Sequence, residues 1–200
     1  FAEACAAMDV AWLEEPLDMY AWHYLAELRR QSRVPIAGGE LNGGWHEFAV
    51  MLEKGCLDLY QPDATFGGGI SDAVRVARAC RERGLAFSPH TWSNGFSMMV
   101  NLHVHAACGD DHPLEYPLEP PGWIPEYRDA PLAEPLLADA NGTVAIPEAP
   151  GLGIELDEDL LARHGEKFFD LTPKGLAVQT IREKGFFTAL KLARKKRRRP

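Results

Sequence analysis

The sequence LDLYQPDATFGGGISDAVRVARACRERGLAFSPH, residues 57–90, contains the unit from which the fold is built. A short apolar run at 57–62 is followed by a stretch of helical periodicity at 71–83 and by a second apolar run at 86–90. Gly84 comes directly after the helical stretch. Helices often end at a glycine in the left-handed conformation, so Gly84 is a plausible end of this helix. The unit therefore predicts a strand, a helix and a second strand parallel to the first, joined by a right-handed crossover.

The same alternation of apolar runs and helical patterns extends on both sides of this unit. We expect further strands at VAWLEEP (10–16), VPIAGG (34–39) and PLE (113–115), and helices at 1–8, 18–33, 44–54 and 96–108. The order of five strands with four helices between them predicts an α/β fold with a parallel sheet. Beyond Tyr116 the chain is rich in proline, which predicts a long loop packed over one end of the sheet.

An acidic or histidine residue closes each expected strand. Glu14, Glu40, Asp63, His90 and Glu115 recur every 23 to 27 residues, about one strand and one helix apart. The carboxyl ends of parallel strands meet at one mouth, which is where a β/α barrel carries its active site. We therefore expect these five side chains to converge.

Two pairs among these residues indicate chemistry. Glu14 and Glu40 are carboxylates on adjacent strand ends, and a hard cation such as Mg²⁺ is the usual means of holding two such groups together. A carboxylate at Asp63 can fix the tautomer of His90 and leave its Nε2 to act as an acid or base. The alternatives are an exposed acid with no ligand role and a hydrogen-bonded structural histidine. Glu15 should point to the opposite side from Glu14 and play a structural part.

Five segments together resemble the mandelate racemase subgroup of the enolase superfamily. They are WLEEP, AGGE, QPDATFGGGISDA, FSPHTW and LEY, in this order and spacing, followed by PGLGIELDEDLL. The resemblance spans about residues 8–165 and does not cover the tail from Glu166 onward. It implies the C-terminal part of a TIM-like (β/α)7β barrel.

The resemblance also defines what this sequence does not contain. A complete barrel needs about 250 residues, and this chain of 200 has no counterpart of the N-terminal capping domain, of the first barrel strands, of the strand with the Lys-containing base motif or of the first metal ligand. We expect two parts: a partial barrel with its return segment at 1–165, and a helical basic tail at 166–200.

Site roles follow from the resemblance, position by position. It implies that Glu14 and Glu40 are the second and third Mg²⁺ ligands and that Asp63 and His90 form the catalytic Asp–His dyad. Glu115 would be the acid that hydrogen-bonds the substrate's carboxylate or the developing enolate, which requires a protonated side chain and a raised pKa.

The implied reaction begins with removal of a proton next to a carboxylate. We expect an Mg²⁺-dependent acid-sugar dehydratase, a hydro-lyase whose enediolate intermediate loses water. A racemase or epimerase of a 2-hydroxy acid is the alternative. It needs a second base opposite His90, so the missing strand with the base motif would decide between the two reactions. A non-catalytic truncated fragment, whose basic tail binds an acidic partner, is a hypothesis of another class.

Charge limits the classes of partner. The net charge is −8, yet the last ten residues, KLARKKRRRP, hold seven Lys or Arg and no acid. Residues 1–190 therefore carry −15, which disfavours nucleic-acid binding because phosphate contacts need clustered Lys and Arg. We expect a small-molecule carboxylate substrate, and no nucleic acid or membrane partner. The tail itself is typical of a solvated end.

Cysteine usage and hydropathy indicate the compartment. The four cysteines form no CxxC pair, so we expect reduced packing residues. No apolar run approaches the ~18 residues of a membrane span, and no leader is recognisable at Phe1. We expect a cytoplasmic protein. The family resemblance implies a homo-oligomer, and the strand edges that a partial barrel exposes would add to the tendency to associate.

Overall fold

The computed structural model describes residues 1–108, 111–165 and 172–196. The chain divides into two compact units, 1–158 and 159–200, and each is described by itself. Within the described residues, no helix combines the length and the apolar character needed to cross a membrane.

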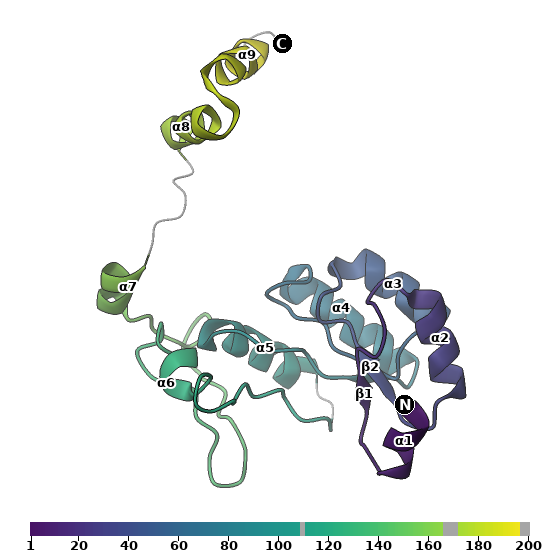
Figure 1. Ribbon diagram of the computed structural model, residues 1–200. Helices are drawn as coiled ribbons and strands as arrows, with labels where there is room; N and C mark the ends of the chain where they lie inside the picture. The colour runs from purple at the N-terminus through teal and green to yellow at the C-terminus, as the bar shows by residue number, and fades with distance from the viewer. Residues whose placement is uncertain (109–110, 166–171, 197–200) are drawn as a thin grey trace. The chain divides into compact units, whose positions relative to one another are not determined.

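The first unit is built on a parallel sheet, which confirms the expected fold class (Figure 1). Its strands are β1 (Leu13–Glu14), β2 (Ile36–Gly38), β3 (Leu59–Tyr60) and β4 (Ala86–Phe87), arranged in the order β1-β2-β3-β4. Each neighbouring pair is parallel. Strands β2 and β3 are fully buried, as parallel strands covered on both faces are.

Helices alternate with these strands. They are α1 (Ala2–Ala7), α2 (Trp22–Gln31), α3 (Gly44–Lys54), α4 (Gly69–Glu82) and α5 (Gly95–Cys108). Figure 1 shows α2, α3 and α4 packed around the sheet. Gly84 has a positive φ of 65°, so the residue expected to end the helix after β3 does lie in the left-handed region.

One apolar core joins the sheet to its helices. Its side chains come from β2 (Ile36), α3 (Phe48), β3 (Tyr60), α4 (Val76) and α5 (Val104), each at most 1 % exposed. Burial of a large apolar side chain stabilises the fold by about 1.5–3 kcal/mol. This core fixes the sheet from which the site residues project.

A second cluster of buried apolar residues includes other side chains of α5. Met98, Met99 and Leu102 pack there against Leu132 and Leu136 of the long loop. No disulfide joins the four cysteines, all of which are described, and Cys56, Cys80 and Cys108 are buried. The interpretation of the cysteines as packing residues fits this placement.

The expected fifth strand at PLE is not formed. Residues 113–118 carry no assigned strand, and side chains rather than a backbone ladder hold them to the sheet. Ser88 Oγ donates to the carbonyl of Pro113 at 2.7 Å, and the backbone N–H of Thr91 donates to Glu115. The loop that follows contains α6 (Pro125–Arg128) and only isolated β-bridges.

The second unit is helical where it is described. It includes most of α7 (Glu158–His164), together with α8 (Pro173–Lys184) and α9 (Phe186–Lys196). Thr172 caps α8, because its Oγ1 accepts from the N–H of Gly175 at 3.0 Å. The predicted boundary between the partial barrel (1–165) and the basic tail (166–200) stays a prediction. Residues 166–171 and 197–200, which belong to the predicted basic tail, lie outside the described residues.

Candidate active site

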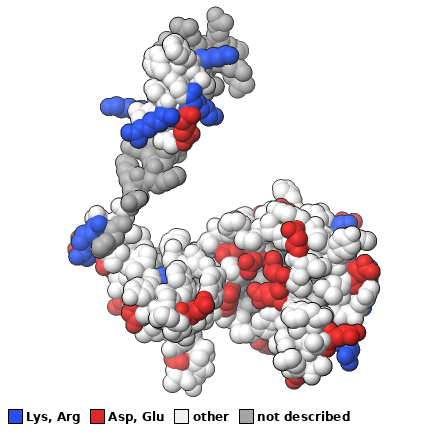
Figure 2. Space-filling model, in the orientation of Figure 1, with Lys and Arg blue, Asp and Glu red and all other residues white. Residues whose placement is uncertain are grey.

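The parallel register brings the predicted residues to one end of the sheet. Glu14 is the last residue of β1, and Glu40, Asp63 and His90 follow β2, β3 and β4 within three residues. Backbone hydrogen bonds continue the pairing of β3 and β4 beyond the ends of these strands. The N–H of His90 donates to the carbonyl of Pro62 at 3.3 Å. In Figure 2, acidic side chains gather on the face of the first unit that is shown.

Asp63 and His90 contact each other directly. His90 Nδ1 lies 3.1 Å from Asp63 Oδ2, and Asp63 is only 5 % exposed. Burial alone would raise the pKa of Asp63, but hydrogen bonds from His90, Asn101 and Thr65 outweigh it and lower that pKa to about 2. Asp63 is therefore ionised at neutral pH and can accept the Nδ1 proton.

The other ring nitrogen of His90 faces two carboxylates. Nε2 lies 3.3 Å from Glu40 Oε2 and 3.9 Å from Glu115 Oε2. Burial would lower the pKa of His90, but the hydrogen bond to Asp63 and the charges of Glu115 and Glu40 raise it above its ordinary value. His90 thus has one nitrogen fixed by Asp63 and one open to proton exchange at the mouth.

Both carboxyl groups beside His90 have a raised pKa. Burial is the main cause for Glu40 and for Glu115, and the nearby charge of Glu14 raises both further, while the charge of His90 opposes the rise. The N–H of Thr91 donates to Glu115 Oε2 at 2.6 Å and holds that carboxyl in place. The expected rise in the pKa of Glu115 agrees with this environment.

Glu14 and Glu15 occupy different surroundings, and Glu15 lies just beyond the end of β1 with a positive φ of 42°. Glu14 Oε2 accepts from Trp12 Nε1 at 3.0 Å and from Gln61 Nε2 at 3.1 Å. Glu15 Oε1 accepts instead from the N–H of Gly39 at 2.8 Å. Glu15 therefore secures the backbone after β2, which is a structural role.

The donor set at the mouth fits part of a magnesium site. Glu14 and Glu40 provide the hard oxygen ligands that Mg²⁺ prefers, and crowding of carboxylates around Glu40 is a condition that a cation relieves. Among the residues that the structure describes, no group of three or more His, Cys, Asp or Glu side chains is placed to hold a metal ion. The two carboxylates alone do not fill an octahedral shell.

Sequence reasoning missed several residues that hold this site together. Asn101, Thr65 and Gln61 bond Asp63 or Glu14, yet none of them closes a strand as an acid or histidine. Asn101 offered one signal: it is a polar residue inside the apolar helix GFSMMVNLHVHAAC. A buried amide in such a helix needs a hydrogen-bond partner.

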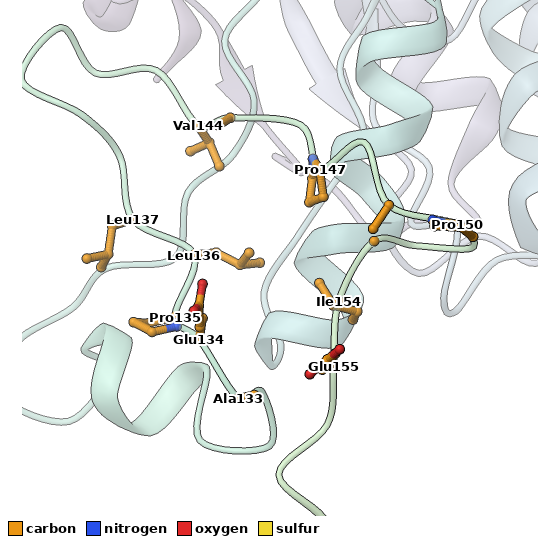
Figure 3. A pocket seen from close by; sticks show the side chains of 13 residues that line it. Ala133, Glu134, Pro135, Leu136, Leu137, Val144, Pro147, Pro150, Ile154 and Glu155 are labelled. Carbon is orange, nitrogen blue, oxygen red and sulfur yellow. The ribbon is translucent and has the colours of Figure 1, made fainter.

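A cavity of about 780 Å³ lies elsewhere in the first unit. Residues 133–137 and 144–155 face each other across it (Figure 3). Its lining contains none of the five strand-end residues. The polar cluster around His90, and not this cavity, is the candidate active site.

Comparison with known proteins shows the family to which the chain belongs. The fold and the cluster define a class, a parallel β/α domain whose titratable side chains meet at the carboxyl ends of the strands. Residues 1–160 match the family model described as "Enolase C-terminal domain-like". The chain belongs to the enolase superfamily, and its structural neighbours place it in the mandelate racemase subgroup.

Three relatives illustrate the similarity. D-galactarolactone cycloisomerase from Agrobacterium fabrum is 34% identical over 166 residues, which are 80% of this chain and 43% of the relative. A mandelate racemase/muconate lactonizing enzyme-like protein from Rubrobacter xylanophilus is 30% identical with a TM-score of 0.72, covering 82% and 40%. L-talarate dehydratase from Polaromonas sp., in complex with Mg and L-glucarate, is 27% identical with a TM-score of 0.68, covering 80% and 41%.

The chain thus spans about two fifths of the length of these relatives. They include an isomerase and a dehydratase, so membership of the superfamily makes this an enzyme family without fixing one reaction. The activity, the substrate and the metal of this chain are matters of proposal.

Proposed function

We propose that this chain carries part of the active site of an Mg²⁺-dependent acid-sugar dehydratase. The observation that carries the proposal is the geometry of His90, with Nδ1 against Asp63 and Nε2 between Glu40 and Glu115. The dehydratase and its carboxylate ligand among the relatives support the substrate class.

Each residue has a role in this proposal. Glu14 and Glu40 would hold Mg²⁺, which when bound would stabilise negative charge on the substrate carboxylate. Asp63 keeps the Nδ1 proton on His90 and thereby leaves Nε2 to exchange a proton with the substrate. Glu115, protonated, would donate a hydrogen bond to the substrate carboxylate.

The proposed reaction is a β-elimination of water. A base removes the proton on the carbon next to the carboxylate, and the electron pair of that C–H bond forms the enediolate. The bond to the β-hydroxyl then breaks, and Nε2 of His90 delivers the proton with which the hydroxyl leaves as water. The enol product tautomerises to a 2-keto-3-deoxy acid. Alternatively, His90 itself is the base.

Product analysis tests this proposal. The purified chain is incubated with Mg²⁺ and a panel of aldonates and aldarates, and 2-keto acids are detected with semicarbazide. We expect a keto acid from at least one sugar acid, and none after EDTA. An epimerised sugar acid without keto acid would favour the racemase alternative, and a lactone rearrangement would favour cycloisomerase activity.

The remaining alternative is a non-catalytic chain. It predicts that no sugar acid of the panel is altered, with or without Mg²⁺. It also predicts that the basic tail binds an acidic partner. That outcome contradicts the dehydratase proposal for this chain. A cytoplasmic location and a homo-oligomeric state stay predictions.

A further inference from the structure

Asn101 has a polar side chain that is completely buried, although it belongs to the apolar helix α5. It is 0% exposed on α5, next to Val100 and Leu102, which are also buried. Burying an amide costs free energy unless its donor and acceptor are both satisfied. The bonds of Asn101 therefore show what its side chain is used for.

Both ends of the Asn101 amide are engaged. Its Oδ1 accepts from the N–H of Ala64 at 2.9 Å, and its Nδ2 donates to Asp63 Oδ1 at 3.0 Å. The backbone N–H of Ala64 can only donate, so the amide oxygen must face it and the amide nitrogen must face Asp63. The orientation of the amide is thus determined by its neighbours.

We propose that Asn101 is a positioning residue, which holds the Asp63 carboxylate so that Oδ2 faces Nδ1 of His90. This inference rests on the proposed role of the dyad. Asp63 Oδ1 accepts from Asn101 and from both the N–H and the Oγ1 of Thr65, each Thr65 bond being 2.7 Å. With Oδ1 occupied in this way, Oδ2 is the oxygen left to meet the imidazole.

Asn101 differs from Thr65 in the element that carries it. Thr65 is exposed and lies on the same loop as Asp63, two residues away. Asn101 lies on the buried helix that follows the strand of His90, and its neighbours Met98 and Met99 are 0% exposed. Asn101 therefore connects the carboxylate to the packed core, so that the dyad is held by a rigid element.

A spectroscopic measurement separates positioning from simple packing. With ¹⁵N-labelled histidine, the Nδ1–H proton of His90 gives a downfield resonance at fixed pH when Asp63 accepts it. In Asn101→Leu we expect this resonance to move upfield and its exchange with water to rise at least ~10-fold, the effect of losing one charge-assisted hydrogen bond. Asn42→Ala is the matched control.

Asn42 is also a completely buried asparagine whose side-chain amide donates to a carboxylate, that of Glu47 and not that of Asp63. Asn42→Ala should lower the unfolding midpoint and leave the His90 resonance unchanged. If Asn101→Leu lowers the midpoint but leaves the His90 resonance as in wild type, Asn101 only fills the core and the inference is wrong.

A measurement on the wild-type chain covers the case in which Asn101→Leu does not fold. We expect the side-chain amide protons of Asn101 to exchange with water at least ~10-fold more slowly than those of the exposed Asn141. Exchange as fast as that of Asn141 would overturn the inference. Neither readout depends on turnover, so an absence of keto acid with both signals intact would count against the proposed function alone.

Discussion

Asp63 Oδ2 lies 3.1 Å from Nδ1 of His90, although the two residues stand on consecutive strand ends 27 positions apart. The helix α4 spans that distance in the sequence, and the parallel pairing of β3 and β4 closes it in space. The contact is therefore a property of the β/α unit. It also makes the ionisation of Asp63 part of the stability of the fold.

Replacing Asp63 by asparagine should lower stability in a pH-dependent way. The pKa of Asp63 falls from 3.8 to about 2 on folding, so its charge stabilises the fold above pH 4 and ceases to do so as the pH falls toward 2. We expect Asp63→Asn to lower the free energy of unfolding by about 2 kcal/mol at pH 5, and the difference from wild type to shrink at pH 2. Urea titrations at both pH values measure it, and a constant difference would contradict the assignment.

Removing either predicted metal ligand should weaken magnesium binding. We expect Glu14→Gln and Glu40→Gln each to reduce Mg²⁺ affinity at least ~10-fold in calorimetric titrations, because each loses a charged oxygen ligand. Glu134→Gln is the control, since Glu134 is an exposed acid in the wall of the cavity of Figure 3. Equal affinities for all four proteins would remove Glu14 and Glu40 from the metal site.

A methyl group at Gly67 should destabilise the turn after β3. A Cβ there would lie 2.6 Å from the carbonyl oxygen of Asn42, a backbone atom that cannot move aside cheaply. We expect Gly67→Ala to lower the free energy of unfolding by about 1–3 kcal/mol, whereas Gly122→Ala, with nothing within 4 Å of its added Cβ, should change it by less than about 0.5 kcal/mol. Similar effects at both positions would refute the close approach.

Breaking the buried ion pair of the long loop should be costly. Arg128 is 0% exposed, and its Nε and Nη2 each lie 2.7 Å from an oxygen of Asp129. Arg128→Met leaves the carboxylate buried and unpaired, so we expect a loss of about 3–5 kcal/mol in thermal or urea unfolding. Adding Asp129→Leu should recover part of that loss, and a further loss in the double variant would contradict the pairing.

The fold was predictable where local signals agreed. The helix expected at 44–54 forms over those residues, and it ends at Gly55 with a left-handed φ of 68°. The helix expected at 18–33 is shorter and begins at Trp22. Asp18 explains the difference, because its side chain accepts from the N–H of Tyr20 and stabilises a turn in place of the first helical residues.

The site was predictable only in part. Strand-end periodicity brought Asp63 and His90 together, because register makes such residues neighbours. It could not show that PLE lacks a backbone ladder, since Glu115 reaches the site through a side-chain bond to Thr91. Nor could it pair Asn101 with Asp63, because that contact depends on how α5 packs and not on local spacing.

Exchange of the substrate α-proton with deuterium tests the central claim most directly. In D₂O with Mg²⁺ and the acid-sugar panel, mass spectrometry should detect deuterium next to the carboxylate for the wild-type chain and for His46→Gln, whose histidine is exposed on α3. The account predicts that His90→Gln lowers keto acid formation by about 100-fold or more, and that it lowers the exchange rate equally where His90 is the base. Keto acid formed by His90→Gln at the wild-type rate, or no exchange in the wild-type chain with any acid sugar, would contradict it.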